Sequence, residues 1–65
     1  MTVDNWKDLT GQHVQIRKDG KPVRKGRVDE VTRAADALWL EWHSGYLRQL
    51  YEKAEGYSVE LVPSP

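Results

Sequence analysis

Alternation of hydrophobic and polar residues is the strongest pattern along this chain. In residues 13–18, Val14 and Ile16 fall on one side of an extended backbone, and polar side chains fall on the other. A period of two is typical of a strand with one buried face. Residues 38–43 repeat the pattern with three large apolar side chains on one side, namely Leu38, Leu40 and Trp42. We therefore predict two strands whose inward residues belong to a common core.

Two further segments are consistent with strands. Residues 23–31 would form the return strand after residues 13–18, and Gly26 within it predicts a bulge or a sharp bend. Val28 and Val31 are three positions apart, so the alternation breaks between them, which also fits a bulge. Near the end of the chain, residues 57–62 predict a last strand. Its expected inward residues are Tyr57, Val59 and Leu61.

Turn residues separate these segments. Asp19-Gly20 is a strong signal for a tight hairpin turn, and His-Ser-Gly-Tyr at residues 43–46 is a second candidate. Pro22 has no N–H for a strand ladder, so we expect it in the turn or at the first position of a strand. These signals predict one hairpin in the first half of the chain and another in the second half.

Residues 46–55 fit two different structures. A helix would gather one apolar face, with Ser44 as its N-cap and Gly56 after its C-terminus. A strand would pair with residues 38–43 and leave a single helical turn in the segment EKAEG. Local propensity favours the helix, whereas the Ser-Gly hairpin signal and the need to close a small sheet favour the strand. We adopt the strand.

The predicted fold is therefore all-β, a small and strongly bent barrel of five strands with one helical turn before the last. Closure of the barrel would limit the exposed strand edges that promote aggregation. The alternative is an α+β domain with a helix at residues 46–55. In either case we expect one domain over residues 1–65, with a short N-terminal turn at residues 4–9, capped by Asp4, and a frayed tail at residues 63–65.

The composition sets limits on how such a domain is stabilised and where it works. With 65 residues and no cysteine, the chain has no disulfide or thiolate metal site to support a small core. Three Trp and three Tyr residues supply large buried areas instead. The N-terminus has no apolar run of a signal peptide, and no segment approaches the roughly 20 apolar residues of a membrane span. We expect a cytoplasmic protein without a membrane partner.

Five positions of the first hairpin resemble a known family. Gly11, Val14, Ile16, Gly26 and Val28 match the spacing of glycine and apolar residues that opens Src-homology-3-like small barrels, in particular the KOW motif. The single helical turn before the final strand is also usual in these barrels. The resemblance covers about half of the chain, and the loop between Ile16 and Gly26 has fewer glycines than the KOW loop usually carries. It implies a small barrel that binds nucleic acid or protein segments through its loops.

Charge is distributed unevenly along a chain whose formal net charge is zero. Residues 17–27 carry a net charge of +5, residues 28–65 carry −4, and residues 1–16 carry −1. Lys and Arg side chains on a hairpin can neutralise the phosphates of a nucleic-acid backbone. They can equally protect a solvated hairpin from aggregation. The basic residues of this hairpin are Arg17, Lys18, Lys21, Arg24, Lys25 and Arg27.

Strand alternation limits how far these six charges can act together. Arg24 and Lys25 are adjacent, so they point to opposite faces unless Gly26 bends the strand. The six charges are therefore expected to surround the hairpin tip rather than form one flat patch.

Aromatic residues are the second candidate for binding. If Leu38, Leu40 and Trp42 are core residues, Trp39 points outward, where it would stack on a base or anchor a partner protein. The alternatives are that Trp39 covers the N-terminal turn beside Trp6 or lies in a dimer interface. We include Trp39 and Tyr46 as candidate interface residues.

Metal and catalytic sites have little support in the sequence. His13 and His43 fall on outward faces of predicted strands, and Glu41 could join them, but two histidines without a fixed third ligand are a weak metal signal. Ser44 follows His43, yet nothing indicates a convergent triad. The chain has no phosphate-binding loop, zinc pattern or nucleophile elbow. We predict no catalytic residues, no metal and no cofactor.

The sequence thus predicts a binding module that is not an enzyme. The first hypothesis is contact with an RNA or DNA backbone through the basic hairpin at residues 17–27. The second is a protein interaction, in which the basic hairpin meets an acidic protein surface. The acidic remainder of a second copy of the chain could supply that surface, so a homodimer is a form of the second hypothesis.

Overall fold

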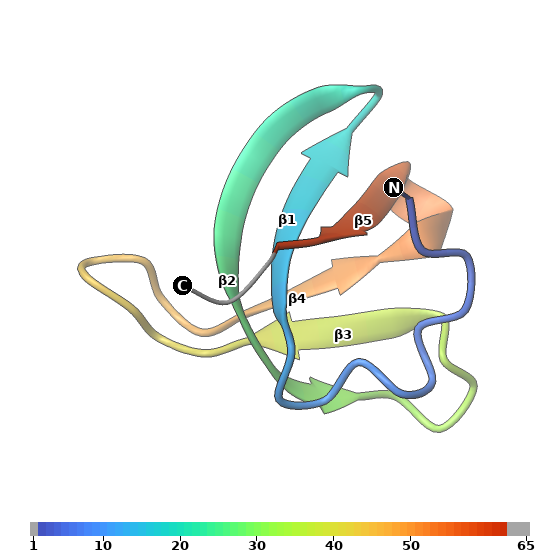
Figure 1. The fold of residues 1–65 in the computed structure, drawn as a ribbon, viewed down its shortest axis with the longest axis horizontal. Coiled ribbons are helices and arrows are strands. Elements are labelled where there is room, and N and C mark those ends of the chain that lie inside the picture. Colours follow the sequence, from blue (N-terminus) through green and yellow to red (C-terminus); the bar gives the residue numbers. More distant parts are fainter. Residues whose placement is uncertain (1, 63–65) are drawn as a thin grey trace.

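Five antiparallel strands form one sheet in the computed structural model, which describes residues 2–62 (Figure 1). The expected tail at residues 63–65 lies outside the described residues. A short 3₁₀ turn, η1, precedes the last strand. In chain order the elements are β1 (His13–Lys18), β2 (Lys21–Val31), β3 (Ala37–Leu40), β4 (Gln49–Glu52), η1 (Lys53–Glu55) and β5 (Tyr57–Leu61). The all-β prediction is confirmed.

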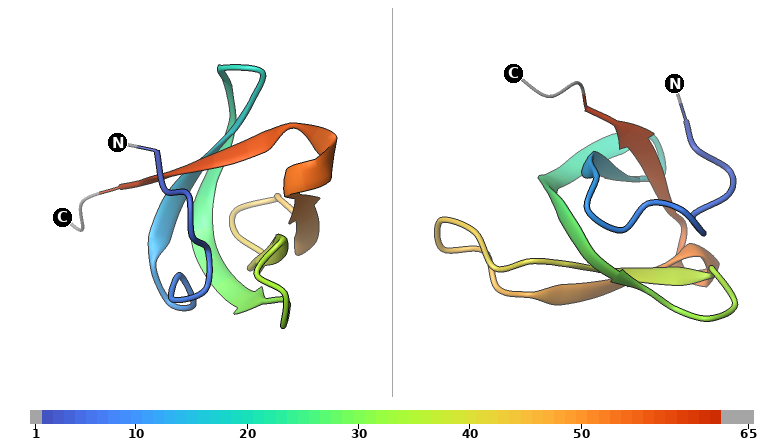
Figure 2. Two further views of the ribbon diagram at one scale, coloured as in Figure 1. Left: turned by 90° about the vertical axis from the view of Figure 1, so that its right-hand side faces the viewer. Right: turned by 60° about the horizontal axis from the view of Figure 1, so that its bottom comes forward.

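The sheet has the order β4-β3-β2-β1-β5 and bends around the core. β2 produces the bend, because its first part pairs with β1 and its last part pairs with β3 (Figures 1 and 2). The edge strands β4 and β5 share no ladder within residues 2–62, so the sheet is open between them. The rings of Tyr51 and Tyr57 span this opening in an edge-to-face contact with centroids 5.0 Å apart.

The ambiguous segment at residues 46–55 forms a strand. Gln49–Glu52 pairs with β3, and η1 follows directly, so the helical alternative is wrong. Both predicted tight turns are also present. Asp19 and Gly20 have φ of 51° and 81°, and Ser44 and Gly45 have φ of 44° and 92°. Positive φ at both central residues is the geometry of a two-residue hairpin, which matches the right-handed twist of the flanking strands.

Irregularities in β2 flank Gly26 rather than fall on it. Gly26 pairs regularly with Val14, so the bulge expected at this residue is absent. The register shifts instead opposite Val23, which has no partner on β1, and at Asp29, which has no partner on β3. The broken alternation between Val28 and Val31 correctly indicated the second bulge.

Gly26 serves a packing role. A Cβ atom at this position would lie 3.1 Å from Cδ1 of Leu40, which is fully buried. Few real Cβ atoms approach a neighbour so closely, so the missing side chain lets Leu40 pack directly beneath β2.

We expect Gly26→Ala to destabilise the protein by about 1–2 kcal/mol, because the added methyl group overpacks the core against Leu40. The measurement is urea unfolding at equilibrium. The same substitution in a Leu40→Val background is the control, since valine lacks the Cδ1 atom. An equal cost in both backgrounds would show that the clash with Leu40 is not the cause.

The core lies on the concave face of the bent sheet. Nine buried residues form it: Trp6, Leu9, Val14, Ile16, Val28, Leu38, Leu40, Tyr51 and Val59. Two residues expected in the core are exposed instead. Leu61 is the last residue of the edge strand β5, beyond the buried Val59, and Trp42 follows the end of β3, where the chain leaves the sheet.

The N-terminal segment covers the open side of the sheet. A turn from Trp6 to Leu9 buries both side chains, and the Leu9 amide donates to the Trp6 carbonyl at 3.1 Å. Asn5 rather than Asp4 caps this turn, because its side-chain oxygen accepts from the Lys7 amide. No helix within residues 2–62 has the length and apolar character needed to cross a membrane.

Candidate functional site

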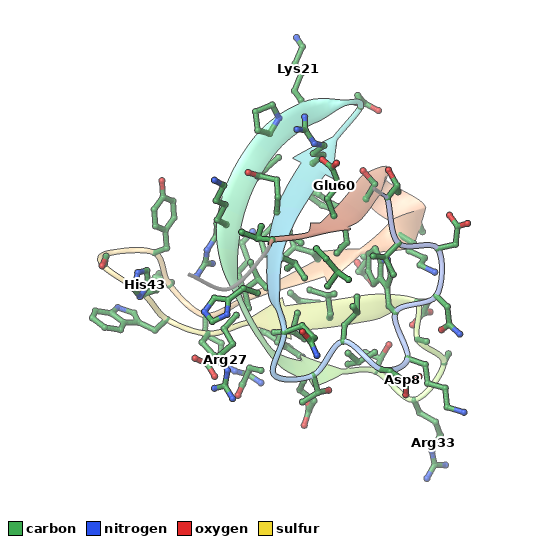
Figure 3. The ribbon with its side chains drawn as sticks, viewed as in Figure 1. Asp8, Lys21, Arg27, Arg33, His43 and Glu60 are labelled. Carbon is green, nitrogen blue, oxygen red and sulfur yellow. The ribbon has the colours of Figure 1, made fainter. Side chains whose placement is uncertain are left out.

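The six basic residues of the first hairpin do not form one patch. Five of them lie at or near the surface of β1 and β2, whereas Arg24 is buried with only 5% of its surface exposed. Arg24 pairs with Ile16, so the strand register directs it toward the inner face of the sheet. Figure 3 shows side chains from this hairpin pointing in several directions, with Lys21 at its tip.

Arg24 fastens a neighbouring loop to the sheet. Its Nη1 donates to the Leu47 carbonyl at 2.7 Å, and its Nη2 donates to the Glu41 carbonyl at 2.5 Å. The guanidinium also lies 5.2 Å from the ring centroid of Tyr46. Within residues 2–62, Arg24 has no ion pair, and its buried Nε has no hydrogen-bond partner. Its buried position removes it from direct contact with a large ligand.

Arg17 and Arg27 are both engaged by acidic residues. Arg17 forms an ion pair with Glu60 on β5, and this hydrogen bond lowers the pKa of the Glu60 carboxyl. Arg27 forms an ion pair with Glu41 at 2.7 Å and donates from Nε to the Gly11 carbonyl at 3.3 Å. The local charge of the hairpin is therefore smaller than its sequence indicates.

Of the three lysines of the hairpin, Lys18 and Lys21 are cross-strand partners next to the turn, and Lys25 lies further along β2. The Lys18 ammonium is 5.1 Å from the ring centroid of Tyr57. Lys21 lies at the hairpin tip and Lys25 lies on the middle of β2, and neither side chain makes a hydrogen bond or ion pair with another described residue. Lys21 and Lys25 are thus the unpaired cations of this hairpin.

The two candidate interface aromatics differ in exposure. Trp39 is half-buried, and the Arg48 guanidinium covers its ring at 4.2 Å from the centroid. Asp29 holds that arginine in place through an ion pair of 2.6 Å. Tyr46, in contrast, is 56% exposed.

Tyr46 is one of three exposed apolar side chains on the β3–β4 extension, residues 41–48. This segment projects from the body of the molecule (Figure 2). Trp42 is 63% exposed and Leu47 is 74% exposed. We call Trp42, Tyr46 and Leu47 the apolar tip. His43 and Tyr46 pair at its end through two backbone hydrogen bonds of 3.0 and 2.9 Å, and Arg24 holds its base, so the tip is a braced structure.

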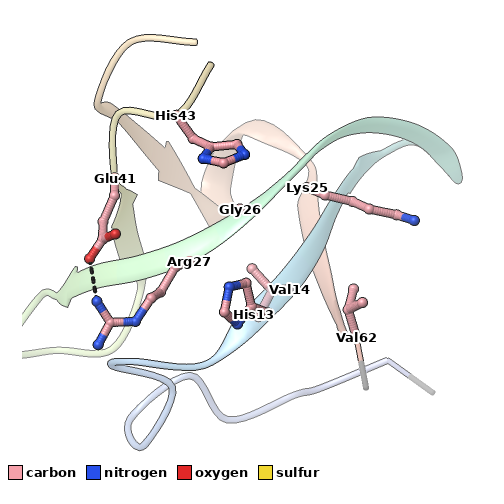
Figure 4. A pocket seen from close by; sticks show the side chains of 8 residues that line it. All are labelled: His13, Val14, Lys25, Gly26, Arg27, Glu41, His43 and Val62. Carbon is pink, nitrogen blue, oxygen red and sulfur yellow. Dashed lines mark hydrogen bonds and ion pairs between the residues drawn. The ribbon is translucent and has the colours of Figure 1, made fainter. Parts of the chain in front are cut away.

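A hollow of about 240 Å³ lies where the extension meets β1 and β2. We call it the outer hollow (Figure 4). Four nitrogen-bearing side chains surround Gly26 there: His13, Lys25, Arg27 and His43. Glu41, Val14 and Val62 complete the lining.

Strand pairing explains why these residues meet. His13 pairs with Arg27, and the Val62 amide donates to the His13 carbonyl at 3.0 Å, which aligns three chain segments. The Glu41 amide donates to the Arg27 carbonyl at 3.0 Å and adds a fourth. Gly26 contributes only backbone to this lining, because a Cβ at its position would point inward toward Leu40.

Glu41 and the two histidines line the same hollow, as the weak metal hypothesis would need. Within residues 2–62, however, no three His, Cys, Asp or Glu residues lie close enough to hold a metal ion. Arg27 already neutralises Glu41, and a guanidinium beside a metal site would oppose cation binding. The described geometry therefore offers no support for a metal centre.

An acidic cluster lies at the opposite end of β4 from the extension. The hydrogen bond that protonated Glu52 donates to the Glu55 carboxylate, and then the negative charge of Glu55, raise the pKa of Glu52. Asp36 adds further repulsion. Exposed apolar side chains therefore lie on the extension before β4, and neighbouring acidic residues lie after it.

Comparisons with protein-family models, with curated proteins and with solved structures gave no match. The apolar tip and the outer hollow are therefore the features from which we infer function.

Of the apolar tip, the sequence predicts only Tyr46 as an interface residue. Alternation places Trp42 in the core, and no pattern marks Leu47 as a binding residue. The available signal was the Ser44-Gly45 turn, since a hairpin that extends beyond its sheet exposes side chains on both faces.

Proposed function

We propose that this chain is a protein-interaction module, not an enzyme, that binds a second copy of itself through the apolar tip. The observation that carries this proposal is the exposure of Trp42, Tyr46 and Leu47 together on one braced extension. Aromatic residues in such positions dominate the binding energy of many protein interfaces. Singly exposed apolar residues are common, but three on a single projecting hairpin favour an interaction surface.

Charge supports a second copy as the partner. The chain has no net charge, so two copies do not repel each other over long distances. Lys21, an exposed lysine of the basic hairpin, complements the acidic cluster around Glu52 and Glu55 of a second copy. The fold we propose for this module is the Src-homology-3-like small barrel that the opening hairpin resembles. The strand order and the 3₁₀ turn before β5 support that assignment.

Sedimentation velocity over a concentration series tests self-association. We expect the double variant Trp42→Ser, Leu47→Ser to raise the dissociation constant at least about tenfold, because it removes the apolar contact. Leu61→Ser is the matched control, since Leu61 is also an exposed leucine but lies on β5, away from the extension. We also expect weaker association at high salt, where the charge complementarity is screened.

A strictly monomeric wild-type protein at low salt and high concentration would refute this proposal. The same samples are to be mixed with a labelled single-stranded oligonucleotide of about 20 nucleotides. Nucleic-acid binding that weakens with salt, at roughly 0.7 log units per log unit of salt for each neutralised phosphate, would instead support the basic hairpin as the functional surface. Lys21 and Lys25 are the residues that favour that second function.

A further inference from the structure

The outer hollow differs from the apolar tip because charged and polar side chains make up most of its lining. Its walls carry two imidazoles, one ammonium and one guanidinium, and Glu41 is the single acid among the residues that line it. Glu41 is already paired with Arg27 at 2.7 Å. The hollow therefore has more positive than negative groups, and this excess grows when an imidazole takes up a proton.

Several donors in the hollow have no partner in the described structure. The side chains of Lys25, His13 and His43 make no hydrogen bond to another residue within 2–62. Arg27 uses Nε and Nη1 for Gly11 and Glu41, which leaves its Nη2 without a hydrogen bond among the same residues. These groups are arranged around one glycine: His13 and His43 lie on either side of β2, and Arg27 and Lys25 lie along it (Figure 4).

The buried positive charge of Arg24 also favours an anion in the hollow. Arg24 lies on the opposite face of β2, beside Gly26, and carries a positive charge that no described carboxylate neutralises. Apolar groups of Val14 and Val62 contribute to the lining and lower the local polarity. Electrostatic attraction is stronger where water is partly excluded. The volume of about 240 Å³ accommodates a small charged group rather than an extended ligand.

We propose that the outer hollow binds a tetrahedral oxyanion group, such as the phosphate or sulfate of a small ester, between His13 and His43 with Lys25 and Arg27 as its counter-charges. This site does not depend on self-association through the apolar tip. Binding strengthens as the pH falls, because protonated imidazoles donate from both nitrogens and add positive charge. The other charged residues that line the hollow are Lys25, Arg27 and Glu41. In Figure 4, Arg27 turns toward Glu41 and Lys25 extends away from the two imidazoles.

Titration with inorganic sulfate, followed by amide chemical shifts in NMR, tests this site. Sulfate keeps its two negative charges between pH 5.5 and 8, so a change in affinity over this range reports on the protein. We expect shifts centred on Gly26, His13 and His43, and an affinity that rises several-fold from pH 8 to pH 5.5. His43→Gln should remove about two- to fivefold of the affinity at pH 5.5 and reduce the pH dependence.

Lys21→Gln is the matched control, because Lys21 is an unpaired lysine of the same hairpin that lies outside the hollow. This control should bind sulfate as the wild type does, whereas Lys25→Gln should bind more weakly by about two- to fivefold. Equal losses in Lys21→Gln and Lys25→Gln, or an affinity that does not change with pH, would refute a specific site and indicate general attraction of anions to the surface.

Two further titrations test which kind of anion binds and whether binding depends on self-association. Repeating the titration with inorganic phosphate and with a methyl phosphate ester distinguishes a free anion from an esterified group, and the proposal requires that the ester binds. Repeating it with the Trp42→Ser, Leu47→Ser variant distinguishes the two proposals. Loss of self-association with unchanged sulfate binding would leave the hollow supported on its own.

Discussion

Replacing Trp6 by alanine is expected to remove half or more of the protein's stability. Trp6 has 1% of its surface exposed and is the largest side chain of the core. Trp→Ala substitutions in cores typically cost about 3–5 kcal/mol, and a domain of this length has a total stability of about 3–10 kcal/mol. The loss should be visible as a collapse of the urea midpoint or as an unfolded spectrum in circular dichroism.

The environment of Trp6 explains why so much depends on it. Its Nε1 donates to the Val3 carbonyl at 3.2 Å, and the Lys53 ammonium lies 4.9 Å from its ring centroid. Lys53 also donates to the Asp4 carbonyl at 2.5 Å, which joins η1 to the N-terminal segment. One side chain thus fills the core and anchors the segment that covers the open side of the sheet.

Trp42→Ala is the matched control for this prediction, since it removes the same side chain from an exposed position. Its effect on the unfolding free energy of the monomer should stay within about 0.5 kcal/mol. A similar loss for both tryptophans would show that Trp6 is not the core residue that the structure describes.

Replacing Arg24 by alanine is expected to cost about 2–4 kcal/mol of stability. The substitution leaves the Glu41 and Leu47 carbonyls without their donor and removes two hydrogen bonds to a charged group. It also removes the buried stem of the arginine from beneath the extension. Chemical denaturation measures the total effect, and amide hydrogen exchange across residues 41–48 measures the local loosening.

Two other variants identify the cause of that loss. Lys25→Ala changes the adjacent, exposed residue and should alter stability by no more than about 0.5 kcal/mol. Arg24→Met keeps an apolar stem without the donors, so it should retain overall stability better than alanine while residues 41–48 still exchange faster. Slow exchange of the extension in Arg24→Met would show that the guanidinium does not hold it.

The strands and turns of this fold follow closely from local sequence patterns. Val14 and Ile16 are buried as their alternation predicts, and Asp19-Gly20 forms the expected turn. The strand at residues 49–52 was predictable only by giving the Ser-Gly turn more weight than helix propensity. These features depend on neighbours in the chain, which is why the sequence indicates them.

The features that define the candidate site depend on residues distant in sequence. Alternation showed that Arg24 and Lys25 face opposite ways, but the burial of Arg24 depends on its register with Ile16 and on the β3–β4 extension that it contacts. Trp42 continues the period of Leu38 and Leu40, yet the ladder ends at Leu40, so periodicity assigned it to the wrong environment.

Local sequence patterns also do not predict the outer hollow. The outward positions of His13 and His43 could be predicted, but their approach depends on the register between strands and on the path of the chain after β3. A local pattern carries no information about either.

The position of β5 has a consequence for how the chain reaches this structure. β5 pairs only with β1 among the strands, so that Val14 lies opposite Leu61, near the far end of the chain. Contacts between such distant residues require a large loop to close first, and proteins rich in them fold slowly. During synthesis, β1 stays without this neighbour until every other strand has left the ribosome, so the complete sheet is expected to assemble after translation of β5.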